Sequence, residues 1–206
     1  MSYLILVRHG QSEWNLLNQF TGFTDVELTE QGKLEAKAAA GLLKDMVLHK
    51  AHTSDLKRAQ HTLDIILEET NHTHIPVKKD PAIKERHYGE LTGMNKDEAK
   101  TKFGDELFLK YRRSWDVAPP KGESLKDTYN RAIPYFEQEI LTDLKAGHNV
   151  IVAAHGNSLR AIIKHLEDIT DDEICNYEIG TGVIYIYKLD DDGKVISKEI
   201  RNHEYK

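Results

Sequence analysis

Tyr3-Leu4-Ile5-Leu6-Val7-Arg8-His9-Gly10 is the stretch that decides the fold of this chain. Its short apolar run predicts a strand that is buried on both faces, as in a parallel sheet. Ligands of open α/β sheets bind beyond the carboxyl ends of the strands, where Arg8 and His9 stand. An arginine offers phosphate or carboxylate a planar fork of donors, and a histidine can act as a nucleophile or as an acid and base. Gly10 allows a sharp turn and a close approach to a ligand, although a strand-end turn with two polar surface residues also fits.

Composition narrows the class of protein. The 206 residues, 39% of them hydrophobic, suit a single α/β domain over 1–206, while length alone also allows two small domains. The formal net charge of −6 argues against a nucleic-acid partner, although a cleft can still focus a local positive field. The single cysteine, Cys175, excludes an internal disulfide framework and fits a reducing compartment.

The N-terminal segment does not resemble a secretion signal. Its apolar run starts at the first residues, is short and ends at Arg8. No stretch approaches the roughly 18 apolar residues that span a bilayer. We therefore expect a cytoplasmic protein without a membrane partner.

Hydrophobic periodicity predicts helices and strands in alternation. Leu34, Ala38, Leu42 and Met46 step by four residues and predict a helix over 33–47 with this stripe in the core. A strand at 50–53 and a following helix continue the alternation.

The helix after the second strand opens near Ser54, which places Arg58 in its first turn. Free N–H groups at such a helix start attract anions. Arg58 is therefore expected at the ligand end of a second strand–helix unit.

The rest of the chain shows the same kind of pattern, without internal repeats or a linker. It predicts an edge strand at Ile75–Val77 and then an excursion over the site at 84–122, with one helix near 96–111. A helix follows from the Ser124 capping box to about Lys145, and Pro134 is expected to kink it. The remaining predicted elements are a strand at 149–154, a helix at 158–166 and a terminal hairpin of 183–189 and 195–200. We therefore expect the excursion to cover a site at the strand ends.

Two apolar strands end in the same way. Val7 is followed by Arg8-His9-Gly10, and Ala154 is followed by His155-Gly156-Asn157. If these strands are near neighbours, both histidines face one pocket together with two arginines, and this set suits a dianionic phosphoryl group. We therefore predict phosphoryl transfer, in which one histidine attacks phosphorus in line and the other groups hold the equatorial oxygens.

Phosphoryl transfer to or from a hydroxyl also needs an acid and base. Glu85, within Lys84-Glu85-Arg86-His87-Tyr88-Gly89, is the candidate. A carboxyl enclosed beside a substrate is expected to have its pKa raised toward neutral by desolvation.

Other kinds of site have weaker support. The close pairs His49/His52 and His72/His74 lie in polar segments without a third ligand at the usual spacing, which favours surface histidines over a metal site. No Walker-type or dinucleotide-binding glycine pattern follows a strand. Cys175 fits the core better than it fits a nucleophile.

The chain resembles a known family. Arg8-His9-Gly10, with His155-Gly156 downstream, resembles the histidine phosphatase superfamily. A longer series of motifs, in order over essentially the whole chain, resembles the cofactor-dependent phosphoglycerate mutase family within it. These motifs are Val7–Asn15, Phe20–Phe23, Thr53–Ala59, Glu85–Gly89, Asn95-Lys96, Tyr111–Arg113 and Ala154–Arg160.

The resemblance implies roles for individual residues. His9 would carry the phosphoryl group, His155 would stabilise the transition state, and Glu85 would donate and accept the proton. Arg8 and Arg58 would bind the transferring phosphoryl group. The substrate's other phosphate and its carboxylate would be held by Ser12, Asn15, Thr21, Gly22, Tyr88, Lys96, Arg112, Arg113, Gly156 and Asn157. From the residues alone, the adjacent arginine pair would equally fit a solvated face.

The resemblance also implies a fold and an activity. The fold would be a three-layer α/β sandwich with a mainly parallel central sheet flanked by helices. The activity would be that of a glycolytic and gluconeogenic isomerase that interconverts 2-phosphoglycerate and 3-phosphoglycerate through a phosphohistidine, with 2,3-bisphosphoglycerate as the priming cofactor and without a metal. The partners would be small-molecule phosphoglycerates, and a homo-oligomer, dimer or tetramer, is allowed. The alternatives are a phosphatase of the same superfamily and a non-catalytic phosphate-binding module.

Two departures from the family pattern stand out, and the first concerns the cover of the site and any oligomer contacts. Longer members carry an insert between the double proline and the Glu-Ser pair, whereas Pro119–Ser124 joins them directly here. Phe23 stands where the family usually has tryptophan. The short charged tail of 201–206 is either a lid over the pocket or a frayed terminus.

Overall fold

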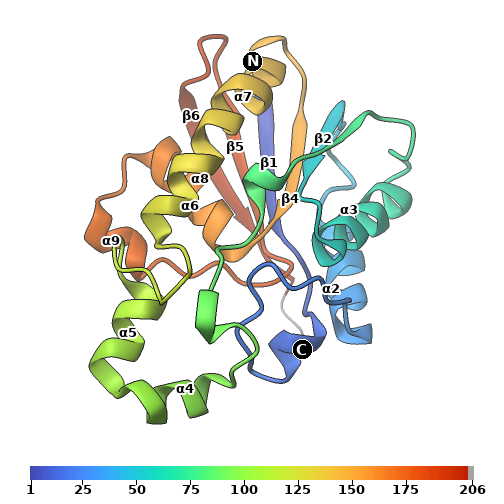
Figure 1. Ribbon diagram of the computed structural model, residues 1–206. Coiled ribbons are helices and arrows are strands. Elements are labelled where there is room, and N and C mark those ends of the chain that lie inside the picture. Colours follow the sequence, from blue (N-terminus) through green and yellow to red (C-terminus); the bar gives the residue numbers. More distant parts are fainter. Residues whose placement is uncertain (204–206) are drawn as a thin grey trace.

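The structure, a computed structural model, describes residues 1–203 and contains a mixed sheet of six strands (Figure 1). The strand order is β3-β2-β4-β1-β5-β6. Neighbouring strands from β3 to β1 are parallel, whereas β5 is antiparallel to both β1 and β6. The strands span Ser2–Arg8 (β1), Lys50–Thr53 (β2), Val77–Lys79 (β3), Val150–Ala154 (β4), Ile184–Leu189 (β5) and Val195–Arg201 (β6).

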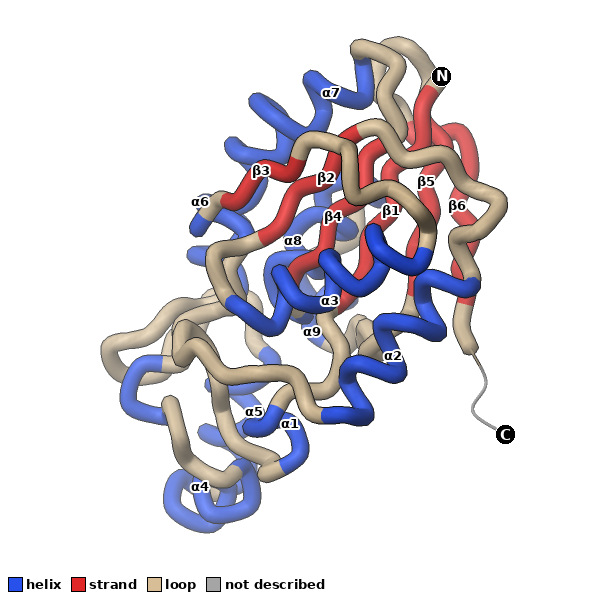
Figure 2. The backbone as a smooth tube through the Cα atoms, turned by 90° about the vertical axis from the view of Figure 1, so that its right-hand side faces the viewer, coloured by secondary structure: helices blue, strands red, loops and turns tan. Residues whose placement is uncertain are grey.

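Helices cover both faces of this sheet, and each face has its own apolar core (Figure 2). On one face lie α2 (Glu30–Gly41) and α3 (Lys57–Glu69). On the other lie α6 (Leu125–Tyr135), α7 (Leu141–Lys145) and α8 (Gly156–Glu167). The predicted three-layer α/β fold with a mainly parallel sheet is confirmed.

The central strands β1 and β4 bring two distant parts of the chain together. Their register places Leu4 opposite Val150 and Arg8 opposite Ala154. Both strands are largely buried, as continuous apolar runs predict. Because the strands are parallel neighbours, the residues that follow them emerge side by side at one edge of the sheet.

The long helix predicted after Ser124 changes pitch at its proline. Ser124 caps α6, which ends one residue after Pro134. A π-helical segment, η3 (Phe136–Ile140), follows and leads directly into α7. Proline has no N–H for the preceding turn, which explains the change of hydrogen-bonding pattern at this point.

The core stripe predicted for a helix over 33–47 is only partly confirmed, because α2 ends at Gly41, before Leu42 and Met46, which still pack against the core. Leu34 is 55% exposed, and the other three residues of the stripe are only partly buried. The buried face of α2 instead carries Ala36, Ala39 and Ala40. Small side chains on this face let α2 pack closely against α3, so the neighbouring helix selects the buried face of α2.

His52 is also different from the prediction, which placed it on the surface. It is 2% exposed, and its Nδ1 lies 2.8 Å from the hydroxyl of Tyr135 while Nε2 lies 3.0 Å from Oδ2 of Asp143. These partners come from α6 and α7, more than eighty residues away along the chain. The polarity of the local sequence therefore could not reveal this burial. His49 and His74 are exposed, as predicted.

The excursion contains two helices where one was predicted. α4 (Lys96–Phe103) and α5 (Asp105–Arg113) are separated by Gly104, whose φ is +76°. A left-handed backbone of this kind breaks a right-handed helix and favours glycine. Both helices lie below the carboxyl ends of the parallel strands in Figure 1.

Short elements complete the described chain. They are α1 (Glu13–Leu16), the 3₁₀ turns η1 (Pro81–Ile83) and η2 (Gly89–Leu91), and α9 (Asp171–Cys175). β5 and β6 form the predicted hairpin. The strand predicted at 75–77 instead begins at Val77, after Pro76, and runs to Lys79, and this β3 does lie at the sheet edge as predicted. The tail predicted at 201–206 extends into residues 204–206, which lie outside the described residues.

Candidate active site

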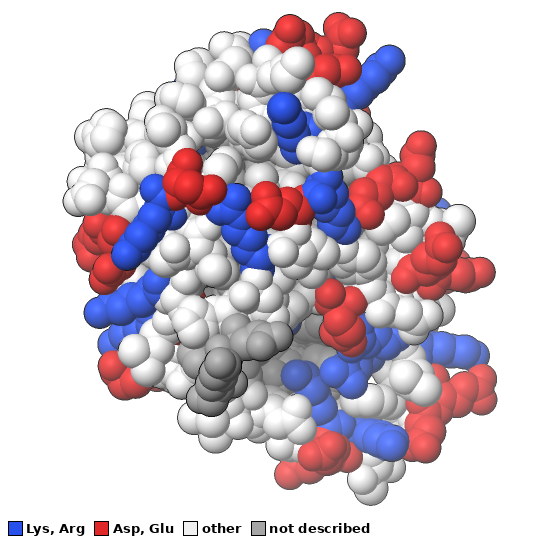
Figure 3. Space-filling model, turned by 180° about the vertical axis from the view of Figure 1, so that it is seen from behind, with Lys and Arg blue, Asp and Glu red and all other residues white. Residues whose placement is uncertain are grey.

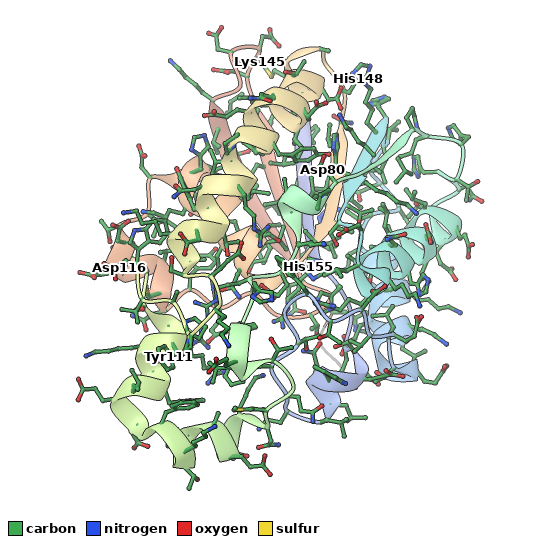
Figure 4. All side chains as sticks on the ribbon, in the orientation of Figure 1. Asp80, Tyr111, Asp116, Lys145, His148 and His155 are labelled. Carbon is green, nitrogen blue, oxygen red and sulfur yellow. The ribbon has the colours of Figure 1, made fainter. Side chains whose placement is uncertain are left out.

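The paired strands bring two histidines together. His9 follows β1 and His155 follows β4, and the amide N–H of His9 donates to the carbonyl of Ala154 at 3.0 Å. The two ring centroids are 5.0 Å apart, with the ring planes inclined at 59°. Figure 4 shows His155 at the lower end of the sheet, with Tyr111 of α5 farther down.

His9 is held as a neutral imidazole. Its Nδ1 lies 2.7 Å from the carbonyl oxygen of Gly10, and because a carbonyl only accepts, Nδ1 carries the proton. Nε2 keeps its lone pair and lies 3.4 Å from Nε of Arg58. Burial, followed by the charges of Arg58 and Arg8, holds the pKa of His9 well below its ordinary value. An unprotonated Nε2 is therefore available at neutral pH.

His155 is oriented by Ser54, a residue that the sequence motifs contain but do not single out. The Ser54 hydroxyl accepts the amide N–H of Leu56 at 3.2 Å and lies 2.7 Å from Nε2 of His155. Its own proton can then be donated to Nε2, which leaves the ring proton on Nδ1. That Nδ1 is buried and has no hydrogen-bond partner among the described residues. Burial, followed by the charge of Arg58, lowers the pKa of His155 well below its ordinary value.

Gly10 is needed for a reason other than the predicted one. A Cβ on Gly10 would lie 2.2 Å from the carbonyl oxygen of Gly32, in the first turn of α2. A Cβ on Gly32 would in turn lie 2.1 Å from the carbonyl oxygen of Gln11. Close packing of the loop against α2 therefore requires Gly10, and its predicted close approach to a ligand stays a prediction.

Two arginines flank the histidines. Arg58, 1% exposed, donates to the carbonyl oxygens of Gly22 and Thr24, each at 2.8 Å. Arg8 donates to the carbonyl of Ile179 at 2.7 Å, and its buried Nε has no partner in the described part of the chain. Burial lowers the pKa of Arg58 to about 10, so its guanidinium is still charged at neutral pH.

Glu85 lies beside these arginines, but the predicted rise of its pKa is wrong. Oε1 accepts the amide N–H of Arg86 at 2.8 Å, and the backbone N–H and side-chain amide of Asn157 at 3.1 and 2.8 Å. Burial would raise the pKa of Glu85, but these hydrogen bonds and the charges of Arg8 and Arg58 outweigh it and lower the pKa. Glu85 is therefore an ionised carboxylate at neutral pH.

A cavity with two lobes opens over these groups, and five residues line both lobes. The histidine lobe is lined by Arg8, His9, Asn15, Gln19, Phe20, Thr21, Gly22, Arg58, Glu85, Tyr88 and Lys96. The arginine lobe is lined by Arg8, Phe20, Glu85, Tyr88, Lys96, Arg112, Arg113, Gly156, Asn157, Arg160, Glu178 and Ile179. Seen from behind, Lys and Arg gather beside a hollow in the lower half of the molecule (Figure 3).

The arginine lobe combines the excursion with α8. Arg112 and Arg113 end α5, and Arg160 on α8 donates to the side chain of Asn157 at 3.0 Å. Arg113 forms an ion pair with Glu178, which also lies 3.6 Å from Arg160. Burial, followed by the charge of Arg113, lowers the pKa of Arg160 to about 10.

The structure places most of the predicted site residues along this cavity, with two exceptions among the described residues. His155 packs against His9 without lining either lobe. Ser12 is fully buried as the N-cap of α1, where its hydroxyl donates to Oδ1 of Asn15 at 2.9 Å. Ser12 therefore shapes the loop that carries Asn15 and does not face the cavity.

Some lining residues received no role from the sequence. They are Gln19, Phe20, Arg160, Glu178 and Ile179. Arg160 does have a signal, because it stands three residues after Asn157, which immediately precedes the helix predicted at 158–166, and residues at this spacing share a helix face. Glu178 has none, since it lies in an irregular loop whose position depends on the whole sheet.

Other sites considered from the sequence find little support. Among residues 1–203, no group of three or more His, Cys, Asp or Glu could hold a metal ion, and no helix is long and apolar enough to cross a membrane. Cys175 is only partly buried, and its thiol donates to the carbonyl of Asp171 at 3.1 Å. Burial raises the pKa of this thiol, which lowers its thiolate fraction and its reactivity.

An unprotonated imidazole nitrogen among buried guanidiniums is suited to the covalent capture of a phosphoryl group. The fold and the site thus define an α/β protein built for phosphoryl transfer through histidine. Residues 4–200 match the family model described as histidine phosphatase superfamily (branch 1). The chain belongs to this superfamily and, within it, to the 2,3-bisphosphoglycerate-dependent phosphoglycerate mutases.

Curated relatives with that name align with this chain over nearly their full length. The 2,3-bisphosphoglycerate-dependent phosphoglycerate mutase of Nitrobacter winogradskyi is 56% identical over 197 residues, which cover 95% of each chain. The protein of the same name from Bradyrhizobium diazoefficiens is 54% identical over 197 residues, with the same coverage.

Solved structures share the fold at lower identity. YhfR of Bacillus stearothermophilus is 26% identical, with a TM-score of 0.82 over 95% of this chain and 94% of its own. A mycobacterial glucosyl-3-phosphoglycerate phosphatase is 23% identical, with a TM-score of 0.83 over 98% of this chain and 99% of its own, a likeness of fold alone.

Proposed function

We propose that this protein is a glycolytic and gluconeogenic isomerase that interconverts 2-phosphoglycerate and 3-phosphoglycerate. The observation that supports this most is the pair of joined lobes, one holding His9 and the other a separate set of guanidiniums. A phosphoglycerate carries anionic groups at both ends, whereas a simple phosphate ester carries one. A second cationic lobe is useful only for the first kind of substrate. The names of relatives at 54% and 56% identity agree with this proposal.

His9 acts as the carrier of the phosphoryl group. Its unprotonated Nε2 attacks phosphorus in line, so that a P–N bond forms while the bond to the leaving oxygen breaks. Arg8 and Arg58 neutralise the phosphoryl oxygens, and Nδ1 of His155 donates a hydrogen bond to one of them. Burial strengthens these interactions because it keeps water away from the charges. The unpartnered donors Nε of Arg8 and Nδ1 of His155 support these roles.

Glu85 moves the proton. When the substrate hydroxyl attacks the phosphorus carried on His9, the P–N bond breaks and the carboxylate of Glu85 accepts the hydroxyl proton. In the opposite direction Glu85 returns that proton to the leaving oxygen. Its carboxylate is ionised at neutral pH and can therefore accept a proton, and its position in the lining of both lobes supports a role close to both ends of the substrate.

The remaining cavity residues hold the part of the substrate that is not transferred. Lys96, Arg112 and Arg113 supply positive charge for its carboxylate and second phosphate. Smaller polar groups complete the site: Asn15, Thr21, Gly22, Tyr88, Gly156 and Asn157.

We propose that the priming cofactor is 2,3-bisphosphoglycerate, the compound that the name of the relatives contains. When bound, it supplies the phosphoryl group that first charges the histidine. The residues of the two lobes would suit its two phosphates, because each lobe contains a buried guanidinium nitrogen without a partner in the described chain, Nε of Arg8 and a terminal nitrogen of Arg113. Arg8 and Arg58 would hold one phosphate, and Arg113 with its neighbours the other. The proposal includes no metal.

We further propose a single domain over 1–206 that works in the cytoplasm on small-molecule phosphoglycerates. The one sheet that unites all strands of the described residues supports the single domain. A homo-oligomer, dimer or tetramer, is also proposed, and light scattering coupled to size-exclusion chromatography measures its mass.

One assay tests the proposed function. Purified protein receives 3-phosphoglycerate, a trace of 2,3-bisphosphoglycerate and a metal chelator. Rapid formation of 2-phosphoglycerate supports the mutase. Inorganic phosphate as the main product supports a phosphatase instead, and no turnover supports a non-catalytic binding module.

A further inference from the structure

Glu178 is an acidic residue in a lobe built mainly of arginines. It lies in the loop between α9 and β5, and its side chain is 68% exposed. Its carboxylate pairs with Arg113 and lies 3.6 Å from Arg160. Glu85, the other carboxylate that lines this lobe, is buried and bonded to Asn157. Glu178 is therefore the solvent-facing carboxylate of the arginine lobe.

The loop that carries Glu178 also holds arginines through its backbone. The carbonyl of Tyr177 accepts from Nε of Arg160 at 2.6 Å, and the carbonyl of Ile179 accepts from Arg8 at 2.7 Å. These backbone contacts keep Arg8 and Arg160 in place independently of the Glu178 side chain. That side chain can change rotamer toward water without disturbing the loop.

We propose that Glu178 is a displaceable counter-ion, whose carboxylate engages, in the free protein, the guanidinium groups that bind the far anionic end of the substrate. It leaves those groups when the substrate enters. This inference rests on the proposed function, because it assigns the arginine lobe to the end of a phosphoglycerate that is not being transferred. Glu178 thus tunes the affinity for substrates with two anionic ends and leaves the chemistry at His9 unchanged.

Charge balance favours the exchange. A substrate anion and the Glu178 carboxylate need the same N–H groups, and two anions at one guanidinium repel each other. An ion pair with an exposed carboxylate is weak, so a ligand anion can replace it. The buried terminal nitrogen of Arg113 that lacks a partner in the described chain gives the incoming anion a further donor.

A neutral side chain of the same shape tests the proposal. We expect Glu178→Gln to bind 3-phosphoglycerate about two- to fivefold more tightly than the wild type, the range that an exposed ion pair is worth. The affinity for phenyl phosphate, which has one anionic group, and kcat at saturating 3-phosphoglycerate are expected to stay unchanged. Calorimetric titration of both ligands and steady-state kinetics measure these quantities.

Asp172→Asn is the matched control. Asp172 is exposed on α9, outside the lining of either lobe, and its substitution changes the net charge by the same amount. This variant is expected to bind both ligands like the wild type.

Three results would overturn the proposal. Weaker binding of 3-phosphoglycerate by Glu178→Gln would mean that Glu178 supports Arg113 and does not compete with the substrate. Unchanged binding would mean that the carboxylate has no influence on the lobe. Equal tightening in Asp172→Asn would point to net charge alone. Failure of the proposed function is recognised separately, by a wild-type protein that forms no 2-phosphoglycerate, while the binding comparison still decides the role of Glu178.

Discussion

The two lobes of the cavity are built in different ways. The histidine lobe takes His9 from a strand end and Arg58 from a helix start, and both residues, like the His155 that packs against His9, are at most 2% exposed. The arginine lobe takes its cations from the 84–122 excursion and α8, and its wall includes the exposed Glu178. The difference teaches that the strand ends and the start of α3 fix the buried histidines and Arg58, while the cations of the second lobe come from peripheral elements.

The electrostatics of the lobes differ as well. In the histidine lobe, burial and neighbouring guanidiniums lower the pKa values of both histidines. In the arginine lobe, cations face a carboxylate that is open to water. Changes in the first lobe are therefore expected to act on rate, and changes in the second on affinity for two-ended substrates.

The largest effect is expected from His9→Ala, which removes the only proposed carrier of the phosphoryl group. We expect kcat for mutase turnover to fall by about 10⁴-fold or more. A coupled assay of 2-phosphoglycerate formation measures the loss, and circular dichroism checks the fold. Substantial residual mutase activity in a folded variant would contradict the assignment.

Glu85→Gln removes the proposed proton acceptor, which lines both lobes. We expect kcat to fall by about 10² to 10⁴-fold with a much smaller change in KM, since general acid–base catalysis contributes that much. Steady-state kinetics with 3-phosphoglycerate separate the two parameters. A rise in KM with an unchanged kcat would instead make Glu85 a binding residue.

Arg113→Ala tests whether the lobes act separately. We expect KM for 3-phosphoglycerate to rise about 10- to 100-fold, since a hydrogen bond to a charged group is worth about 1.5–3 kcal/mol. Hydrolysis of a simple phosphate monoester should be unaffected, because that ester does not reach the arginine lobe. An equal loss of activity toward both substrates would show that the two lobes do not act separately.

Acid is expected to destabilise the protein through the histidine lobe. The folded-state pKa values of His9 and His155 lie below their unfolded values, so the unfolded chain binds more protons as the pH falls below about 6.5. The contribution of the two neutral histidines to the free energy of unfolding is therefore complete above that pH. Below it, this contribution declines by up to about 1.4 kcal/mol per pH unit for each histidine.

Urea unfolding at pH 7 and pH 5.5 measures this dependence. His9→Asn should reduce the loss of unfolding free energy between the two pH values, whereas Arg113→Ala should leave it as in the wild type. An unchanged pH dependence in the His9 variant would show that its imidazole is not protonated more easily in the unfolded chain.

The smallest loss of rate is expected from Ser54→Ala, which removes the hydrogen bond between Ser54 and His155. We expect kcat to fall by about fivefold, corresponding to a hydrogen bond worth about 1 kcal/mol, with KM for 3-phosphoglycerate unchanged. Ser54→Thr keeps the hydroxyl and should restore the rate. A threonine variant as slow as the alanine variant would contradict the idea that the Ser54 hydroxyl fixes the ring proton of His155 on Nδ1.

Much of the fold follows from local patterns. The runs that become β1 and β4 predict buried parallel strands, and Ser124 with Pro134 predicts a capped helix that changes course. The exposed Leu34 shows where local patterns fail, because the partner helix and not the helix itself selects the buried face. Gly104 is a second failure of local patterns: periodicity predicts one continuous helix, whereas the left-handed backbone of Gly104, which periodicity does not reveal, divides it in two.

By itself, the sequence determined the kind of site: strand ends that carry His9 and His155, with arginines nearby and a basic pair farther along the chain. Only the tertiary structure decided the ionisation of Glu85 and the presence of Glu178 among the arginines. The reason is physical. A strand and its end residues are set by neighbours in the chain, whereas a pKa or an ion pair depends on groups that folding brings from distant segments.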